Sequence, residues 1–495
     1  MSDRTELIRP QLYGKNLDAP TTVLVLDDNK LIRNVLYIGL KKKGYDVKTA
    51  KTIDEAVTIA KSPGVDIAIV DYGLGEKLTG FDAITTLQRN HYLPVILMSA
   101  RNTTLDGLDL GHESGLHYKT RGFVRKGDTT TFVDDIVRHV DRVFSPETER
   151  TFNYPVGYRF GQYISKEQWR IGSIAEVHRG KFVDSDTGVE SENTYAIKVM
   201  RAPSDLCGRR VFLALMVYGW DSCKQYFNLC KRLSDAPASK NLVHLEHCNS
   251  IDSPGDSGPI RYFIEEFING PTLREYLDTR ESGILPMNQF LEIFSQAASG
   301  LNRLHKVGLA HRDVVPYNIL LENIESNIPR VVITDFGSTR RIRDHREPVV
   351  MSSFAYIAPE QLRGKPGAIQ ADRWALGICM YEALTGVRPF QTSSDLEPRG
   401  KPLPFKQACE RDEKLAESIL HDTIIPPSVM KQQRITDGYI TCPSAQEPIP
   451  EKIDNMIMNL LVKGLARMKL SSAITRMNEV ARSFKRAKRR PTIDF

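Results

Sequence analysis

Short apolar runs alternate with amphipathic stretches through residues 22–144, and this alternation constrains the fold more than any other feature of the sequence. The runs TVLVLDD, VDIAIVD, PVILMSA and GFVRKG are typical of strands that are buried on both faces. The stretches between them have helical spacing, and one of them, NKLIRNVLYIGLKKKG, ends at Gly44 as helices often do. Repeated βα units predict an α/β fold, a doubly wound parallel sheet with helices on both faces.

Each predicted strand is closed by a polar residue. Asp27 and Asp28 follow the first strand, Asp71 closes DIAIVD, Ser99 closes VILMS, and Lys126 closes FVRK. The carboxyl ends of parallel strands meet at one edge of the sheet, so these side chains are expected to lie together. Clustered carboxylates repel one another unless a cation joins them, and hard oxygen ligands suit Mg²⁺. A lone strand-end aspartate is usually a helix cap, but five such residues in order predict a site that makes an acyl phosphate.

On these residues, the segment 21–145 resembles the receiver domain of two-component response regulators, a flavodoxin-like fold with a five-stranded parallel sheet. The resemblance implies a role for each residue: Asp71 as phosphate acceptor, Asp27, Asp28 and Asp71 as Mg²⁺ ligands, Ser99 as switch hydroxyl, Lys126 as phosphate-binding lysine and Phe123 as switch aromatic. It also implies an upstream histidine kinase as partner. Gly127 stands where the family usually has proline, and the loop GLGEKLTG is one residue longer than usual.

The pattern of apolar and polar residues changes beyond this segment. SPETERTFNYP breaks the pattern with two prolines and is typical of a linker, and helical stretches dominate after residue 270. The end of the chain, FKRAKRRPTIDF, is more typical of a solvated tail than of an anion-binding surface. The predicted parts are an N-terminal extension (1–20), the α/β domain (21–145), a linker (146–160), a second domain (161–485) and a basic tail (486–495).

The second domain contains the stretch HRDVVPYN, in which Asp313 and Asn318 lie on one predicted loop. Two strand-like runs, NILL and VVIT, separate Asn318 from Asp335, and a hairpin would return Asp335 beside Asn318. That arrangement pairs two oxygen ligands for Mg²⁺ and leaves Asp313 to accept a hydroxyl proton. Lys198, in the strand-like run TYAIKVM, can reach a phosphate. These are the components of phosphoryl transfer.

Five motifs in order make the second domain similar to a protein kinase domain of the serine/threonine type, a bilobal α+β fold. They are YAIK, HRDVVPYN, DFG, APE at 358–360 and DRWALG at 372–377. Any one of them is weak by itself, whereas five in order are specific. Small-molecule phosphotransferases share the aspartate and asparagine pattern but are not expected to carry APE followed by DRWALG.

The kinase resemblance implies ATP and Mg²⁺ as cofactors and a protein substrate. It assigns Asp313, Lys198 and Asn318 to catalysis and Asn318 with Asp335 to Mg²⁺ binding. Activation-loop hydroxyls are expected at Ser352 and Ser353, and Arg312 suggests control by phosphorylation. The implied nucleotide-binding residues are Gly172, Val177, Ala196, Lys198 and the hinge residues Glu266 and Ile268.

Four departures from the kinase pattern bear on activity. The glycine-rich loop is degenerate, since Gly172 and Val177 stand five apart where the pattern needs seven. No glutamate lies between 193 and 245 to pair with Lys198, and Asp221 is the only well-placed acid there. Glu265 occupies a position where an apolar residue is usual. Val315 replaces the lysine that touches the transferred phosphoryl group, a loss of about 2.7–4 kcal/mol of transition-state stabilisation.

Net charge, cysteine spacing and the lengths of apolar runs limit the partners and the location that can be expected. A net charge of +6 over 495 residues is too weak to predict a nucleic-acid partner. The seven cysteines form no metal-ligand spacing, MSDRTELIRP has no apolar core, and no apolar run is long enough to span a bilayer. A cytoplasmic protein with reduced thiols and no membrane contact is expected.

Two functions remain open at the level of sequence. One is a phosphorelay-controlled serine/threonine kinase, in which a histidine kinase phosphorylates Asp71. The alternative is a catalytically weak or inactive pseudokinase that acts as a signalling module. The sequence leaves open the identity of the histidine kinase and of the substrate, the sign of regulation, and whether the chain forms a homodimer.

Overall fold

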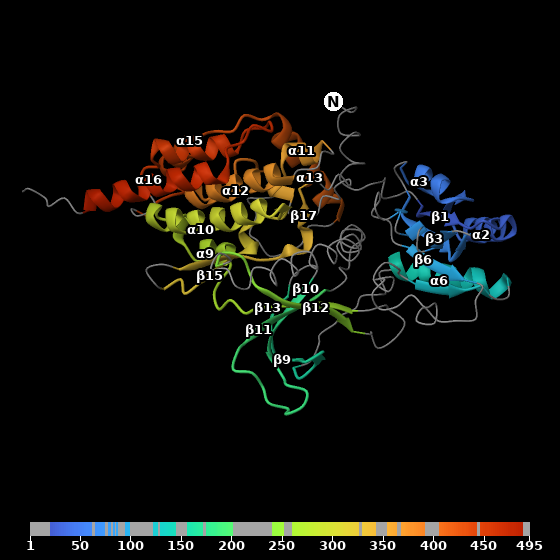
Figure 1. The fold of residues 1–495 in the computed structure, drawn as a ribbon. Coiled ribbons are helices and arrows are strands. Elements are labelled where there is room, and N and C mark those ends of the chain that lie inside the picture. Colours follow the sequence, from blue (N-terminus) through green and yellow to red (C-terminus); the bar gives the residue numbers. More distant parts are fainter. Residues whose placement is uncertain are drawn as a thin grey trace, which may run out of the picture. The chain divides into compact units, whose positions relative to one another are not determined.

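The structure is a computed structural model in which the two predicted domains and both lobes of the second are visible (Figure 1). It describes the residues 20–61, 65–74, 78–80, 83–84, 86–87, 95–99, 122–126, 129–144, 156–171, 175–200, 240–251, 260–325, 329–342, 354–363, 368–391, 405–442 and 446–488. The chain divides into two compact units, one made of 1–224 with 246–265 and the other of 225–245 with 266–495.

The first domain is a parallel α/β sheet, as predicted. Its five strands stand in the order β2-β1-β3-β6-β7, which is the order of a doubly wound fold with one reversal of direction. The elements are β1 (Thr22–Leu26), α2 (Lys30–Lys42), β2 (Asp46–Ala50), α3 (Ile53–Lys61), β3 (Ile67–Asp71), a small hairpin of β4 (Gly73–Leu74) and β5 (Leu78–Thr79), β6 (Val95–Ser99), β7 (Gly122–Arg125) and α6 (Thr129–Phe144).

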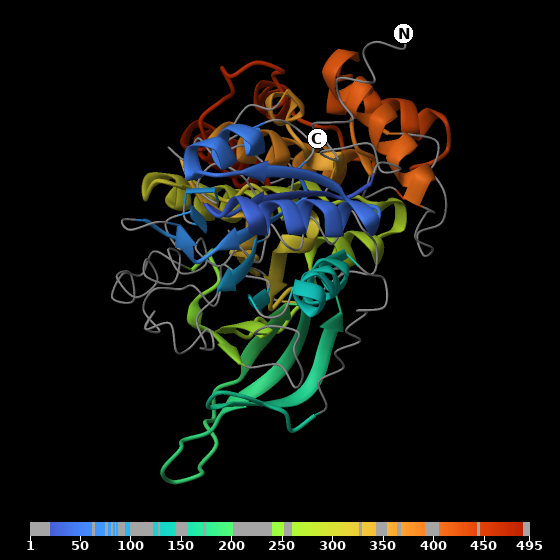
Figure 2. The same cartoon turned by 90° about the vertical axis from the view of Figure 1, so that its right-hand side faces the viewer.

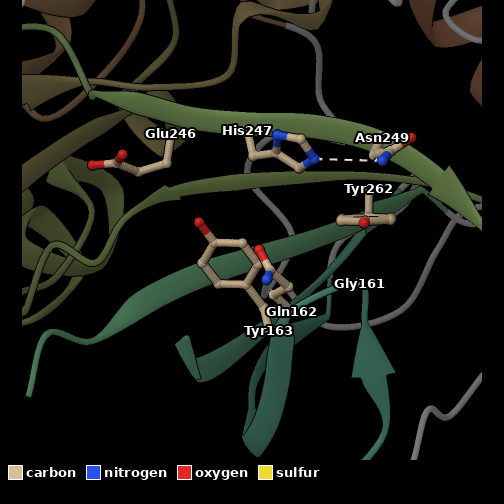
Figure 3. Close-up of a pocket in the computed structure, with 7 residues that line it drawn as sticks. All are labelled: Gly161, Gln162, Tyr163, Glu246, His247, Asn249 and Tyr262. Carbon is tan, nitrogen blue, oxygen red and sulfur yellow. Dashed lines mark hydrogen bonds between the residues drawn. The ribbon is translucent and has the colours of Figure 1, made fainter. Parts of the chain in front are cut away.

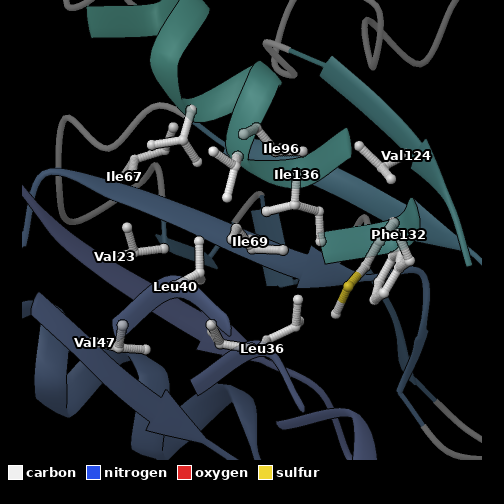
Figure 4. Close-up of a cluster of buried hydrophobic side chains, with 14 residues drawn as sticks. Val23, Leu36, Leu40, Val47, Ile67, Ile69, Ile96, Val124, Phe132 and Ile136 are labelled. Carbon is white, nitrogen blue, oxygen red and sulfur yellow. The ribbon is translucent and has the colours of Figure 1, made fainter. Parts of the chain in front are cut away.

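Side chains alternate between two cores along each strand of this sheet. On β1, Val23 and Val25 pack with α2 and α6 in one cluster, which Figure 4 shows, whereas Leu24 and Leu26 pack with α3 in another. A strand with both faces covered must be apolar throughout, which explains the continuous apolar runs. The carboxyl edge of the sheet lies outside both cores, and its residues are polar.

The N-terminal lobe of the second domain is a six-stranded sheet in the order β12-β13-β11-β10-β9-β8 (Figure 2). Phe160, Ile197, Val199, Tyr262 and Ile264 form an apolar cluster on one face of it. The strands are β8 (Arg159–Phe160), β9 (Tyr163–Ile171), β10 (Ala175–Phe182), β11 (Tyr195–Met200), β12 (Leu245–Ile251) and β13 (Ile260–Glu266). Strand β8 lies at the end of the stretch predicted as a linker.

The C-terminal lobe is mostly helical. Its first elements are α9 (Leu273–Asp278), η5 (Glu281–Gly283), α10 (Met287–Lys306), β14 (Leu309–Ala310), η6 (Pro316–Asn318), β15 (Ile319–Glu322), β16 (Arg330–Ile333), η7 (Phe336–Ser338), β17 (Arg340–Arg341) and η8 (Phe354–Tyr356). The later helices are α11 (Pro359–Leu362), α12 (Ala368–Thr385), α13 (Phe405–His421), α14 (Pro427–Thr436), α15 (Glu451–Leu460) and α16 (Leu470–Lys488). A curled antiparallel sheet followed by a helical lobe confirms the predicted kinase-type fold.

Helix α12 is the centre of this lobe. Nearly every residue from Ala371 to Thr385 is buried, because α10, α14 and α15 all pack against it. A helix that is apolar on all sides belongs in a core, so this segment can hold polar groups only where they are bonded. Among the described residues, no helix has the length and the apolar composition needed to cross a membrane.

Candidate functional site

Three carboxylates meet at the edge of the parallel sheet where the sequence predicted them. Oxygen atoms of Asp27, Asp28 and Asp71 all lie within 4.8 Å of one another. Lys126 follows β7 and joins two of them: its Nζ lies 2.7 Å from Asp27 Oδ2 and 2.8 Å from Asp71 Oδ2. One ammonium thus offsets part of the repulsion among three acids.

The surroundings of each acid differ. Asp27 is buried, and its Oδ1 accepts a hydrogen bond of 2.7 Å from the amide N of Asn29, the residue that caps α2. Asp28 is exposed and faces solvent. Gly73 follows Asp71 closely, and a Cβ built on it would lie 4.0 Å from Asp71 Oδ2. A cluster with one exposed and two buried carboxylates matches the oxygen donor set that Mg²⁺ prefers.

Burial raises the pKa of Asp71 above its ordinary value, and the nearby charge of Asp27 adds to this effect. The hydrogen bond and the charge of Lys126 act in the opposite direction and favour the ionised carboxylate. A nucleophilic carboxylate must be ionised to attack phosphorus, so Lys126 supports the reactive form.

Of the two predicted switch positions, Ser99 lies at this edge as the last residue of β6, whereas Phe123 is the second residue of β7, three positions before Lys126. Ser99 is buried at the end of β6, and its carbonyl oxygen accepts a hydrogen bond of 2.8 Å from the amide N of Lys126. Phe123 pairs with Leu97 in the register of β7 on β6, while its side chain lies outside the described part of the structure. The structure therefore brings Ser99 and Lys126 to the acidic cluster, and their switch roles stay predictions.

In the second domain, a buried aspartate of α12 fixes the backbone of the catalytic-type loop. Asp372 Oδ2 accepts from the amide N of His311 (2.8 Å), and its Oδ1 accepts from the amide N of Arg312 (2.6 Å). Its Oδ2 also bonds His305 Nε2 at 2.7 Å. Burial acts to raise the pKa of Asp372, but these partners outweigh it and leave that pKa below the ordinary value.

Asp313 and Asn318 lie together on the loop so held. The Nδ2 of Asn318 donates to the Asp313 carbonyl at 2.9 Å and to Asp313 Oδ2 at 3.0 Å. Arg312 just before them has φ 69°, a left-handed conformation that costs free energy for a residue with a side chain. The two amide bonds to Asp372 maintain this conformation, which turns the chain toward Asp313.

The predicted hairpin returns the DFG segment to this loop. Strands β15 and β16 are antiparallel with Ile319 opposite Ile333, and the amide N of Thr334 donates to the Asn318 carbonyl at 3.0 Å. His311 bonds the Thr334 carbonyl through Nε2 at 3.0 Å. Asp335, the next residue, is left-handed with φ 68°. The predicted hairpin is confirmed, and it brings Thr334, the residue before Asp335, into hydrogen-bond contact with Asn318.

His311 has one tautomer that satisfies both of its bonds. Its Nε2 faces a carbonyl oxygen and must donate, whereas its Nδ1 accepts from the amide N of Asp313 at 3.3 Å. The ring also stacks edge-on against Phe336 of the DFG segment, with centroids 5.2 Å apart. His311 therefore links Asp313 to the DFG segment.

Val315, the replacement for the expected lysine, is turned inward. Its side chain is 4% exposed, and Val314 beside it is also buried. The described part of this loop therefore presents two apolar side chains between Asp313 and Pro316, where the family pattern has one cation.

The predicted nucleotide residues of the N-terminal lobe are brought together in part. Val177 and Lys198 are directly opposite on β10 and β11, so their side chains share one face of the sheet, and Ala196 lies on the same face two residues along. Glu265 is buried at the end of β13. Gly172 lies outside the described residues, as do Gly127, Asp221, Ser352 and Ser353.

The hinge residues Glu266 and Ile268 form hydrogen bonds with other residues of the protein. The amide N of Glu266 donates to the His244 carbonyl at 2.9 Å, and its carboxylate receives both bonds of Arg330 Nη2 at 3.0 Å. The Ile268 carbonyl accepts from the amide N of Gly270 at 3.1 Å. Their contact with adenine stays a prediction.

A pocket of about 240 Å³ lies elsewhere in the N-terminal lobe, between the β8–β9 turn and β12 (Figure 3). Tyr163 and Tyr262 flank it, with His247 on one side and Gln162 on the other (Figure 3). None of the predicted nucleotide residues lines this pocket, so it is separate from the predicted ATP site.

Two residues of the sequence motifs, Asp372 and Glu360, act as buried anchors in the structure. Asp372 had no assigned role, although an acid inside an otherwise apolar helix is a signal that it binds buried donors. Glu360 of the APE motif forms a buried ion pair with Arg467, whose Nη2 donates to Glu360 Oε2 at 2.8 Å. Arg467 also lies over the ring of Trp374, 5.0 Å from its centroid. This pair ties the APE segment to the chain between α15 and α16.

Two family models match the chain. The Protein kinase domain matches residues 177–463, and the Response regulator receiver domain matches residues 23–117. The first match covers more than half of the chain, and the two together confirm the family resemblances predicted from the motifs.

Curated serine/threonine kinases are among the similar proteins. Serine/threonine-protein kinase PknB of Mycobacterium tuberculosis is 34% identical over 242 residues, which are 48% of this chain and 34% of the relative. PknB of Mycobacterium leprae is 29% identical over 249 residues, 48% of this chain and 36% of the relative. A probable serine/threonine-protein kinase PknB of Lactococcus lactis is 31% identical over 158 residues, 31% of this chain and 24% of the relative.

The chain spans at most about a third of the length of these relatives. The fold, the buried Asp372 and Glu360 anchors and the loop around Asp313 all agree with that match. The chain therefore belongs to the protein kinase family and carries a response regulator receiver domain ahead of its kinase domain.

Proposed function

We propose that the chain is a serine/threonine protein kinase whose activity is controlled by phosphorylation of Asp71. The observation that carries the proposal is the hydrogen-bonded pair Asp313–Asn318 on a loop that Asp372 holds in place. Similarity to PknB kinases supports the reaction class, and the receiver in the same chain supports the mode of control.

In the proposed reaction, a serine or threonine oxygen attacks the γ-phosphorus of ATP, the bond to the bridging oxygen breaks, and ADP leaves. Asp313 accepts the hydroxyl proton. Asn318 uses Nδ2 to bond Asp313, so its Oδ1 would be left to hold Mg²⁺, together with the carboxylate of Asp335. Bound Mg²⁺ supplies neutralising charge for the phosphates. Lys198 binds the α- and β-phosphates, and Glu266 and Ile268 offer backbone groups to adenine.

In the receiver, the Asp71 carboxylate attacks the phosphorus of a phosphohistidine on a histidine kinase, the P–N bond breaks, the imidazole leaves, and an acyl phosphate forms. Asp27, Asp28 and Asp71 would hold Mg²⁺, and Lys126 would bind a phosphoryl oxygen. The changed charge would act through Ser99 and Phe123. The partners proposed are a histidine kinase, a protein substrate and a second copy of the chain, in the cytoplasm.

Transfer from γ-labelled ATP to a generic protein substrate tests the kinase proposal. Asp313→Asn keeps the shape of the loop but removes the base, so the rate is expected to fall about 10²- to 10⁴-fold. Asp278→Asn, on the exposed side of α9, is a matched control that should keep the wild-type rate. Equal labelling by the wild type and Asp313→Asn would sink the proposal.

The buried position of Val315 favours a second candidate, a pseudokinase that binds nucleotide weakly and does not turn it over. Such a protein has no cation on the catalytic loop to stabilise the transferred phosphoryl group. It predicts that ATP with Mg²⁺ raises the melting temperature little and that no transfer occurs, even with Asp71 phosphorylated. Measurable transfer that Asp313→Asn abolishes excludes it.

A further inference from the structure

Three polar side chains form a buried hydrogen-bonded chain inside the N-terminal lobe. The Oγ of Ser165 bonds His178 Nδ1 at 2.9 Å, and His178 Nε2 bonds Glu176 Oε1 at 3.1 Å. Ser165 and His178 are 0% exposed and Glu176 is 1% exposed. Gln168 Nε2 donates to the second oxygen of Glu176 at 3.4 Å.

The order Ser–His–Glu is that of a hydrolase triad, but burial excludes this role. No substrate carbonyl can reach a hydroxyl with no exposed surface, and a catalytic nucleophile must be reached. A carboxylate only accepts hydrogen bonds, so Nε2 of His178 carries the hydrogen in its bond to Glu176. The three hydrogen-bonded side chains therefore have a positioning role within the fold.

One end of this chain flanks the predicted nucleotide site. Val177 stands between Glu176 and His178 on β10, so its side chain points to the opposite face of the sheet, where it lies opposite Lys198. Fixing the side chains on both sides of Val177 fixes the direction of Val177 itself. In this chain the hairpin lacks most of the glycines that the family pattern uses at this point.

The other end lies against the segment that joins the two domains. The Ser165 carbonyl accepts from the amide N of Gly157 at 2.7 Å, and the Ser165 amide N donates to the Tyr158 carbonyl at 2.9 Å. Both residues belong to the stretch that follows the receiver. The ring of Phe160, from β8, lies 6.0 Å from the imidazole of His178.

We propose that Ser165, His178 and Glu176 are positioning residues that hold the nucleotide-binding hairpin and connect it to the segment leaving the receiver. A shift of that segment at Ser165 moves His178, and through Glu176 it changes the orientation of β10 at Val177. A buried polar group that is fully bonded fixes one geometry, because any alternative leaves it unsatisfied. The positioning part stands by itself, whereas the connection to the receiver rests on the proposed function.

Affinity of the full-length protein for a fluorescent ATP analogue with Mg²⁺ tests the positioning part. Ser165→Ala removes the first link without adding volume and is expected to weaken affinity about 3- to 30-fold. His178→Gln can keep the bond to Glu176, and His178→Asn can keep the bond to Ser165, so each cuts one link. Ser185→Ala, an exposed serine of the same lobe, is the control and should bind as the wild type does.

Thermal unfolding of each variant shows whether it is folded, and Ser165→Ala serves as the mild variant if a His178 variant is not. Combining Ser165→Ala with His178→Asn should weaken binding less than the product of the single effects, because either substitution alone already interrupts the series of hydrogen bonds. Unchanged affinity in folded Ser165→Ala and in both His178 variants overturns the positioning role.

Treatment with acetyl phosphate tests the connection to the receiver. The wild-type affinity for the analogue is expected to change at least about fivefold, in either direction, and Ser165→Ala to lose that response. A response of equal size in Ser165→Ala, or no response in the wild type, overturns the connection. Because analogue binding does not require phosphoryl transfer, a wild type that binds but transfers no label contradicts the kinase proposal alone.

Discussion

The receiver pocket and the catalytic loop both place aspartates for phosphate chemistry, but they balance the charge differently. In the receiver, Lys126 lies 2.7 Å from Asp27 and 2.8 Å from Asp71, so a cation is part of the pocket. In the catalytic loop, the neutral amide of Asn318 contacts Asp313, and buried Val315 stands two residues after Asp313. The receiver pocket contains the ammonium of Lys126, whereas the catalytic loop has a valine where the family pattern has a lysine.

The two sites also differ in what holds them. The receiver acids stand at the ends of strands whose pairing fixes their positions, with Asp71 opposite Met98. The catalytic loop has no such ladder, and Asp372 fixes it through two backbone amides instead. A site built on strands is held more precisely than a site on a loop, which depends on its buried anchor.

The largest expected effect is the loss of receiver phosphorylation when Asp71 is replaced. Acetyl phosphate should label Asp71, whose carboxylate oxygen bonds phosphorus while the acyl P–O bond breaks and acetate leaves. Asp71→Asn has no nucleophilic carboxylate, so an alkali-labile adduct should be absent by intact-mass measurement. Asp46→Asn, an exposed acid of β2 paired with Lys41, is the control and should label normally. An adduct of unchanged yield in Asp71→Asn would show that another residue is the acceptor.

The next effect tests the anchor of the catalytic loop. Asp372→Asn places an amide donor against backbone N–H groups and breaks the pair with His305, which should lower the free energy of unfolding by about 3–5 kcal/mol. Denaturant unfolding at neutral pH measures this loss. A variant as stable as the wild type contradicts the view that the loop depends on Asp372.

The same variant has a pH signature. The folded-state pKa of Asp372 is below its ordinary value of 3.8, so its contribution to stability is present above that value and is lost as the pH falls through the folded pKa. The difference in stability between the wild type and Asp372→Asn should therefore shrink as the pH is lowered below about 4. A difference that stays constant would assign the loss to packing.

The receiver pocket could be predicted from the sequence because its residues follow the carboxyl ends of parallel strands. Continuous apolar runs located the strands, and parallel pairing brings Asp27, Asp71 and Lys126 to one edge without further information. The β15–β16 hairpin followed from two adjacent strand-like runs. In both cases the residues that meet are fixed by pairing rules that the sequence pattern already contains.

The features that sequence reasoning missed depend on tertiary burial. Ser165, Glu176 and His178 read as ordinary polar positions of two strands, and only the fold shows that their face is covered. Asp372 was part of a recognised motif, but its partners lie about 60 residues away in the chain. The inward direction of Val315 also depends on neighbours that strand or loop patterns do not specify.

The smallest effect tests the charge difference between the two sites directly. Val315→Lys places a cation on the catalytic loop, as Lys126 does in the receiver. Because Val315 is 4% exposed, the new side chain must extend out of a buried position, and part of the gain is spent on that change. An increase in kcat of about tenfold is therefore expected, equal to about 1.4 kcal/mol in transition-state free energy.

Val315→Met separates charge from bulk, since it adds a long unbranched side chain without an ammonium. If the loop lacks only a cation, Val315→Lys raises kcat while Val315→Met does not, and adding Asp313→Asn to Val315→Lys removes the gain. If both variants leave kcat unchanged, the missing charge already comes from Lys198 and Mg²⁺, and the contrast between the two sites lies in their supporting structure. Since the lysine acts on the transferred phosphoryl group, its effect should appear in kcat more than in the KM for ATP.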